Sequence, residues 1–275
     1  MAVLYSRDRT SSEQGRILDS FFRSTRVLFY LVRIEIRQKY AGSLLGMSWL
    51  FLYPLVFLTF YAGVYLVVFK VRIPELSNWG YVLTVFCGLV PYLGFSDALQ
   101  QGVQSLSSNV NLLKNTVFPP LLIPVKTVFV SQVAHSAALT VLLAMTLASG
   151  KLHGALWLLP VIFILQTALI QGVVWIVSFL SIVLKDIQYV LNLALFFLLF
   201  ISPVAFTPGM APHFLQKMLH FNPLHYTITL YRYCFLGANQ FPAFELTVMA
   251  VICPVVFGLG YFFFKKNHKL LLEYV

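Results

Sequence analysis

Aromatic side chains recur at every fourth position through the first apolar segment of the chain and offer a surface for stacking. They are Trp49, Tyr53, Phe57, Tyr61, Tyr65 and Phe69. Each four-residue step along an α-helix exceeds a full turn by about 40°. The row of rings, which we call the aromatic ladder, therefore winds part of the way round the helix. Aromatic faces give broad contact at little entropic cost, and tyrosine adds a hydroxyl. This chemistry suits sliding contact with the C–H faces of sugars, with Trp49, Tyr53, Phe57 and Tyr61 as candidate pathway residues. Ordinary packing and interfacial aromatic belts are the alternative interpretation.

Motifs for covalent chemistry and nucleotide binding are missing from the sequence. It has no GxxxxGK[ST] phosphate loop, no GxSxG or HExxH motif and no Cys/His set with zinc spacing. The spacing of His213, His220 and His225 suits no standard metal motif, so we interpret them as interfacial polar residues. No acidic pair lies inside an apolar segment, so the sequence lacks the carboxylates that would carry protons through the membrane. We predict no catalytic residue, no metal and no cofactor in this chain, and the energy for uphill movement must then come from a partner or a gradient.

The composition is that of a polytopic membrane protein. Of the 275 residues, 59% are hydrophobic and only 10% are charged, whereas a soluble domain carries about 25% charged residues. A formal net charge of +10 would suggest nucleic acid in a soluble protein. Here the excess of Lys and Arg in cytoplasmic loops explains it more simply, so we expect membrane lipids and no nucleic acid as partners.

Six segments meet the length of about 20 apolar residues that a transmembrane helix needs. They are 46–69, 81–99, 121–148, 155–184, 187–206 and 244–264. Six spans put both termini on one side, and most of the 19 Lys and Arg residues fall on that side, which favours an N-in, C-in topology. We predict an all-α polytopic fold with a cytoplasmic N-terminal segment (1–45), a six-helix transmembrane domain (46–264) and a cytoplasmic tail (265–275).

An amphipathic helix is predicted before the first span. Its apolar stripe is Leu18, Phe21, Phe22, Leu28, Phe29, Val32 and Ile36, and the basic stripe beside it contains Arg23, Arg26, Arg33 and Arg37. Such a helix lies along the membrane surface, with its apolar side in lipid and its arginines among anionic head groups. It is either a topology determinant alone or a helix that also contacts a cytoplasmic partner.

The polar connection between the second and third spans predicts a short surface helix. Asn109 or Asn111 can cap a helix over 112–117, and Pro119 would end it. Its apolar side chains, Leu112, Leu113 and Phe118, lie on a cytoplasmic turn in the predicted topology. They form either a plug for a groove in another protein or a helix that rests on the bilayer.

Residues 184–232 contain a helix that breaks at membrane depth. The stretch opens with the charged corner Lys185-Asp186 and breaks at Ser202-Pro203. Irregular backbone at that depth is tolerated only where protein or a watery cavity satisfies it. The break therefore indicates a pathway or gate rather than an anchor.

Further along, Asn222 can cap a helix that begins at Pro223 and stops at Gly237. At 1.5 Å per residue this helix is about 22 Å long, too short to cross the membrane. We therefore predict two short re-entrant helices between spans five and six, which form an outer gate. The candidate gate residues are Pro203, Pro208, Asn222, Pro223, Tyr231 and Arg232.

Four motifs, in the same order along the chain, resemble the membrane subunit of ABC-2 type exporters of the polysaccharide group (O-antigen, capsule and teichoic-acid permeases). The first is Arg37-Gln38-Lys39-Tyr40-Ala41-Gly42-Ser43-Leu44-Leu45-Gly46-Met47-Ser48-Trp49 with Pro54. The others are Asn111-Leu112-Leu113-Lys114 with Phe118-Pro119, then Lys185-Asp186-Ile187, then Ser202-Pro203 with Phe221-Asn222-Pro223-Leu224 and Tyr231-Arg232. Together they cover most of the chain.

This resemblance implies a homodimer with one pore, driven by two copies of a separate ATPase subunit that holds ATP and Mg. It implies a coupling helix that docks on the ATPase, made of Asn111, Leu112, Leu113, Lys114, Phe118 and Pro119. The amphipathic segment would be the interface helix, and the pieces between Thr207 and Gly237 would be the periplasmic gate.

The expected function is that of a transporter subunit, not an enzyme. It would export a lipid-linked polysaccharide such as O-antigen across the bacterial inner membrane. Two alternatives stay open. One is an ABC-2 permease for a small lipid or drug. The other is an intramembrane glycosyl-lipid transferase, which would need buried acids or a metal site.

Overall fold

The computed structural model describes residues 26–68, 70, 77–115, 119–150, 154–237, 240–268 and 271, and the side chains of Asn111, Leu112 and Asn115 are outside this description. Across the described residues the secondary structure is helical and contains no strand, which confirms the predicted all-α class. Arg23 and Phe118, two of the candidate site residues, lie outside the described residues.

A helix over residues 26–40 comes first and carries the C-terminal part of the predicted amphipathic stripe. A turn with positive φ at Gly42 (76°) and Gly46 (51°) separates it from the first apolar helix. The elements that follow are η1 (Gly46–Ser48), α2 (Trp49–Gly63), the π-helix η2 (Val64–Val68), α3 (Asn78–Val103), η3 (Ser107–Asn109), α4 (Val110–Asn115), α5 (Leu122–Ala148), η4 (Gly154–Leu158), α6 (Leu159–Val183), α7 (Ile187–Ile201), η5 (Pro208–Met210), α8 (His213–Leu219), α9 (Pro223–Leu236) and α10 (Ala243–Asn267).

Within the described residues, 5 helical stretches are long and apolar enough to cross a membrane. They are Gly46–Val68, Asn78–Val103, Leu122–Ala148, Ala155–Val183 and Ala243–Asn267, and each coincides with a predicted span. The predicted fifth span, 187–206, differs because its helix, α7, covers only Ile187–Ile201. The backbone leaves the helix at Ser202, where ψ is 144°. A 15-residue helix is about 22 Å long, which is shorter than a hydrocarbon core of about 30 Å.

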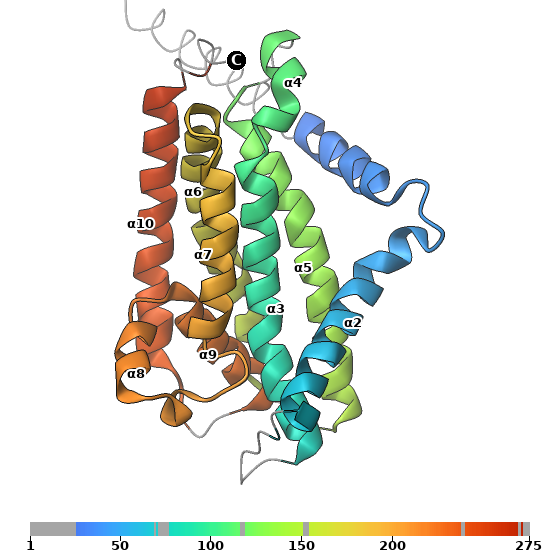
Figure 1. Cartoon of the computed structure of the whole chain (residues 1–275), viewed down its shortest axis with the longest axis vertical. Helices are drawn as coiled ribbons and strands as arrows, with labels where there is room; N and C mark the ends of the chain where they lie inside the picture. The colour runs from blue at the N-terminus through green and yellow to red at the C-terminus, as the bar shows by residue number, and fades with distance from the viewer. Residues whose placement is uncertain are drawn as a thin grey trace, which may run out of the picture.

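Helices α3, α5, α6, α7 and α10 run roughly along one axis and alternate in direction, whereas α2 is inclined to them (Figure 1). The helix over 26–40, α4 and the C-terminal end of α10 lie at one end of the bundle, and α8 and α9 lie at the other. We call these the α4 end and the α8–α9 end. The described N-terminal helix and the C-terminal end of α10 are thus at the same end of the bundle.

Helix α3 is the centre of the bundle, whereas α2 is only slightly embedded in it. In the most apolar stretch of each, 83% of the α3 residues are buried but only 17% of those of Gly46–Val68. Helix α3 contacts α2, α5, α6, α7 and α9. Towards the α4 end, α2 leans away from α3 and α5 (Figure 1). The wall that α2 forms is therefore held by few contacts within this chain.

Helices α6 and α10 form the most extensive helix pair. They approach closely at Gly172 and Gly260, where a Cβ on Gly260 would overlap the carbonyl of Gly172. Small residues let helix backbones pack closely in a membrane, where the hydrophobic effect does not drive association between helices. Trp175 closes the pair on the α4 side by packing its ring on Phe257 and Tyr261. This closely packed pair lies on the side of the bundle away from α2 (Figure 1).

Candidate functional site

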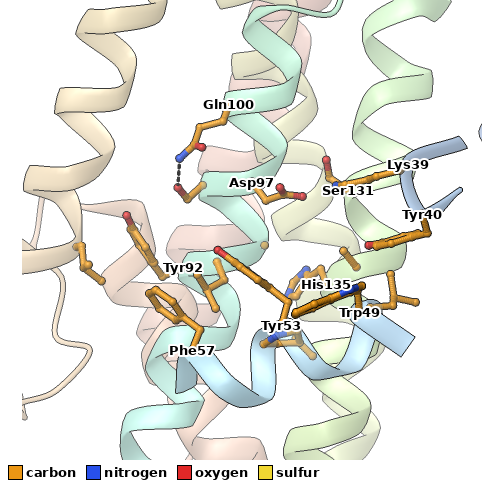
Figure 2. Close-up of a pocket in the computed structure, with 18 of the residues that line it drawn as sticks. Lys39, Tyr40, Trp49, Tyr53, Phe57, Tyr92, Asp97, Gln100, Ser131 and His135 are labelled. Carbon is orange, nitrogen blue, oxygen red and sulfur yellow. Dashed lines mark hydrogen bonds between the residues drawn. The ribbon is translucent and has the colours of Figure 1, made fainter. Parts of the chain in front are cut away.

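A groove of about 590 Å³ lies between α2 and the central helices (Figure 2). One wall comes from the end of the first helix and from α2, and it includes Lys39, Tyr40 and Trp49. The other comes from α3 and α5, with one residue, Leu199, from α7. The groove therefore joins segments that are distant in the sequence.

The aromatic ladder of α2 supplies one face of the groove. Trp49, Tyr53 and Phe57 line it, and the rings of Tyr53 and Phe57 lie 6.3 Å apart with 20° between their planes. Tyr61 is the next step of the ladder and stacks on Phe57, but it does not line the groove, and its hydroxyl donates to Tyr65 at 3.4 Å. Three of the four candidate pathway residues thus face one cavity.

Polar side chains of α3 and α5 supply the opposite face. Asp97, Gln100, Ser131 and His135 line the groove, and the side chain of Gln100 turns along α3 to donate to Ser96 Oγ at 3.0 Å (Figure 2). Asp97 accepts a hydrogen bond of 2.6 Å from the side chain of Gln101. A surface with aromatic rings on one side and hydrogen-bonding groups on the other can hold an amphipathic ring such as a sugar.

At the α4 end of the groove, Tyr40 faces this polar side. Burial, and secondly the negative charge of Asp97, raises the pKa of Tyr40 above its usual value. Its hydroxyl therefore stays protonated and can donate a hydrogen bond. Tyr40 and Lys39 add a donor and a positive charge where the first helix meets the groove.

A buried hydrogen-bond chain leads from the groove to α9. His135 Nε2 lies 3.3 Å from the hydroxyl of Tyr231, which donates to Gln166 Oε1 at 3.1 Å. Gln166 Nε2 in turn donates to the carbonyl of Pro91 at 2.8 Å. Gly94 makes room for the imidazole, since a Cβ there would lie 2.5 Å from the His135 ring. We call His135, Tyr231 and Gln166 the buried relay, and it joins α3, α5, α6 and α9.

The irregular segment after α7 is held by side chains from α9 and α3. The guanidinium of Arg232 donates to the carbonyls of Pro203 at 2.7 Å, Val204 at 2.9 Å and Phe206 at 3.3 Å. The hydroxyl of Tyr81 donates to the carbonyl of Ala205 at 3.0 Å. Backbone that leaves a helix at membrane depth needs such partners, because lipid offers none.

The predicted cap and stop of α9 are confirmed. Asn222 is the N-cap, and its side chain accepts from the backbone N–H of Leu224 at 2.9 Å and donates to Ser202 at 2.8 Å. Pro223 is the first helical residue, and Gly237 ends the helix with φ 72°. The candidate gate residues Pro203, Asn222, Pro223, Tyr231 and Arg232 therefore lie in one interconnected region. Pro208 begins η5 nearby in the chain.

The connection after α3 contains the predicted short helix, with a different start. Helix α4 covers Val110–Asn115 rather than 112–117. The side chain of Leu113 is only 7% exposed and packs on Leu106, Trp175 and Phe264 of the bundle. Leu113 thus faces inward, because its own bundle offers an apolar site. Lys114 and Pro119 are exposed.

The remaining candidate residues lie on the surface. Arg26, Arg33 and Arg37 are exposed on the first helix, and Lys185 and Asp186 are exposed at the turn between α6 and α7. The sequence did not identify Asp97, Ser131 or His135 as groove residues. A signal was present in α5, where Ser131, Gln132 and His135 interrupt an apolar segment with helical spacing.

Residues 26–236 match the sequence family described as ABC-2 type transporter. Two proteins named O-antigen export system permease protein RfbA, from Klebsiella pneumoniae, are each similar to this chain, with 24% identity over 239 residues, 86% of this chain and 90% of theirs. A protein of the same name from Myxococcus xanthus is 24% identical over 263 residues, 94% of this chain and 98% of its own.

Proposed function

Because this chain belongs to the ABC-2 type transporter family, we propose that it is the membrane subunit of an exporter that moves a lipid-linked polysaccharide such as O-antigen. The observation that carries this proposal is the match, over nearly the whole chain, to relatives named as O-antigen export permeases. The chain is thus a transporter subunit rather than an enzyme, placed in the inner membrane of a bacterium.

The groove supports a polysaccharide as the substrate. Trp49, Tyr53 and Phe57 offer aromatic faces to sugar rings, and Asp97, Gln100 and Ser131 offer hydrogen bonds to hydroxyl groups. Such contacts repeat along a polymer without requiring one fixed register. Since α2 is little buried within this chain, its wall can move and widen the groove as a polymer passes.

The energy comes from a separate ATPase subunit, in two copies, that binds ATP and Mg. The permease would be a homodimer with its pore between the two copies. The surface that meets the ATPase would be the coupling segment, η3 and α4 with Pro119, together with the exposed arginines Arg26, Arg33 and Arg37 of the first helix. This arrangement places the α4 end in the cytoplasm, with both termini inside.

The α8–α9 end would then form the periplasmic gate, with α8 and α9 as re-entrant helices. Arg232 and Asn222 hold the segment after α7 against α9, so movement of α9 would carry this segment with it. The buried relay connects the same helix to the groove. Opening of the gate and widening of the groove would therefore be linked.

Deletion of the gene, followed by analysis of polymer at the cell surface, tests the substrate class. We expect the polymer to be made but to remain on the cytoplasmic side of the membrane, and the intact gene to restore its surface display. Normal surface polymer in the deletion strain would favour a small lipid or drug as the substrate. Loss of polymer synthesis itself would favour a glycosyl-lipid transferase.

A further inference from the structure

One salt bridge is present within the described residues, and it is at the α4 end. Lys126, near the start of α5, places its ammonium 2.7 Å from Glu35 Oε2 on the first helix. The same ammonium donates to Asn109 Oδ1 of η3 at 3.0 Å. The side chain of Lys126 is only 6% exposed, whereas that of Glu35 is 33% exposed. A single buried cation thus connects three elements.

This contact fixes geometry more than it adds stability. A buried ammonium must keep its partners, because an unpaired buried charge is strongly unfavourable. The Asn109 side chain is itself positioned, since its Nδ2 donates to the carbonyl of Ser105 at 2.7 Å. Lys126 therefore holds the coupling segment and the first helix at a set distance from α5.

The first helix continues directly into the groove wall. Glu35 lies one helical turn before Lys39 and Tyr40, which line the groove. The chain then turns through Gly42 and Gly46 into α2, which is little buried within this chain. A displacement of Glu35 would accordingly shift the part of the wall that carries Lys39, Tyr40 and Trp49.

We propose that Lys126 is a positioning residue that joins the coupling segment to the first helix, so that movement of the coupling segment shifts the groove wall. This inference rests on the proposed function, in which the ATPase acts on the coupling segment. It assigns the transmission of that movement to the Glu35–Lys126–Asn109 contact.

Three variants of Lys126 separate this role from simple packing. Lys126→Met keeps most of the apolar stem and removes both polar contacts, while Glu35 can turn to water. Lys126→Arg keeps the charge. The double variant Glu35→Lys, Lys126→Glu reverses the salt bridge, but the Asn109 amide could donate to the new carboxylate only by giving up its hydrogen bond to Ser105, so this variant regains only the contact between positions 35 and 126. Lys266→Met removes the same charge from an exposed position at the end of α10 and is the matched control.

Polymer exported per ATP hydrolysed, measured for the permease with its ATPase in vesicles, is the first readout. We expect this ratio to fall about five- to tenfold in Lys126→Met, within the range of coupling between sites, while ATP hydrolysis continues. Lys126→Arg and Lys266→Met should stay near the wild-type ratio, and the reversed pair, which regains the contact between positions 35 and 126, should lie between Lys126→Met and the wild type. A wild-type ratio in Lys126→Met, or a reversed pair no better than Lys126→Met, would overturn the proposal.

The second readout needs neither ATPase nor substrate. Spin labels on cysteines introduced at Gln38 and Ser108, both exposed, report the distance between the first helix and the coupling segment. The native cysteines Cys87, Cys234 and Cys253 are buried and label poorly. We expect a narrow distance distribution in the wild type and the reversed pair, and a broad one in Lys126→Met.

If the distance distribution in Lys126→Met is as narrow as in the wild type, Lys126 does not hold the coupling segment to the first helix, whatever the substrate is. Failure of the wild-type complex to move polymer would instead contradict the proposed function. The distance measurement would still decide the role of Lys126. The two failures are therefore distinguishable.

Discussion

The hydroxyl of Tyr231 on α9 lies 3.3 Å from Nε2 of His135 on α5, and this contact ties the groove to the α8–α9 end of the bundle. Both side chains are buried, and their rings lie 6.2 Å apart with 14° between the planes. Gln166 completes the relay from α6. Polar groups that satisfy one another inside an apolar bundle specify one packing arrangement, because an alternative arrangement would leave some of them unpaired.

Loss of the Tyr231 hydroxyl should loosen this arrangement. Tyr231→Phe leaves His135 Nε2 and Gln166 Oε1 without their partner, and we expect a loss of about 1–3 kcal/mol of stability. Thermal unfolding of the purified permease measures the change. Tyr233→Phe on the same helix is the control, since the Tyr233 ring packs on Phe241 at the surface of the bundle and keeps that contact. Equal stability of the two variants would show that the buried relay does not stabilise the bundle.

Arg232 should control the order of the segment after α7. Arg232→Met removes the donors to the carbonyls of Pro203, Val204 and Phe206, each bond to a charged group being worth about 1.5–3 kcal/mol. We expect hydrogen exchange in peptides over 202–206 to become much faster, with little change in α5. Lys217→Met, which removes an exposed charge from α8, should leave exchange in this segment unchanged. Slow exchange in Arg232→Met would mean that other contacts hold the segment.

Aromatic residues of the groove should affect transport more than stability. Tyr53→Ala and Phe57→Ala each remove one stacking face, worth about 0.5–1.5 kcal/mol, so we expect export to slow about two- to tenfold. Phe60→Ala is the control because Phe60 is 74% exposed on α2 and does not line the groove. The measurement is the rate of polymer export at equal amounts of permease. A larger effect of Phe60→Ala than of the two groove variants would place the pathway elsewhere.

Lowering the pH should reduce the stability of the folded protein through protonation of His225, at the α8–α9 end. Burial first, and then the charge of His220, lowers the pKa of His225 below its usual 6.5. A histidine with a lowered pKa in the folded state favours folding while it is neutral. This contribution is present above about pH 6.5 and is lost as the pH falls below that value.

Thermal unfolding between pH 7.5 and pH 5 measures this dependence. We expect the wild type to lose more stability over this range than His225→Gln, which cannot gain a proton. His213→Gln serves as the control, because His213 is exposed on α8 and its removal should leave the pH dependence as it is. The same pH profile in the wild type and His225→Gln would rule out this role for His225.

The sequence predicts most of the fold because the membrane imposes simple rules on it. The length of the hydrocarbon core sets the length of a span, so hydropathy locates five long helices. Local chemistry sets the ends of α9, with Asn222 as its cap and Gly237 as its stop.

Tertiary packing determines what local patterns do not contain. Leu113 faces inward because Leu106, Trp175 and Phe264 form an apolar site for it, and this site exists only after α6 and α10 have packed. The sequence predicts the break at Ser202-Pro203, but only tertiary packing brings Arg232 and Tyr81 to the backbone that follows α7. His135 and Asp97 become groove residues only because α2, α3 and α5 come together.

Polymer movement by the purified permease, reconstituted in vesicles with its partner ATPase, is the decisive measurement for the proposed export function. The assay follows transfer of a lipid-linked polysaccharide across the vesicle membrane after addition of ATP and Mg. We expect transfer only when both subunits and ATP are present, and slower transfer with Tyr53→Ala. ATP-driven transfer of a small amphiphile without transfer of the polymer, or no association between the permease and the ATPase, would contradict it.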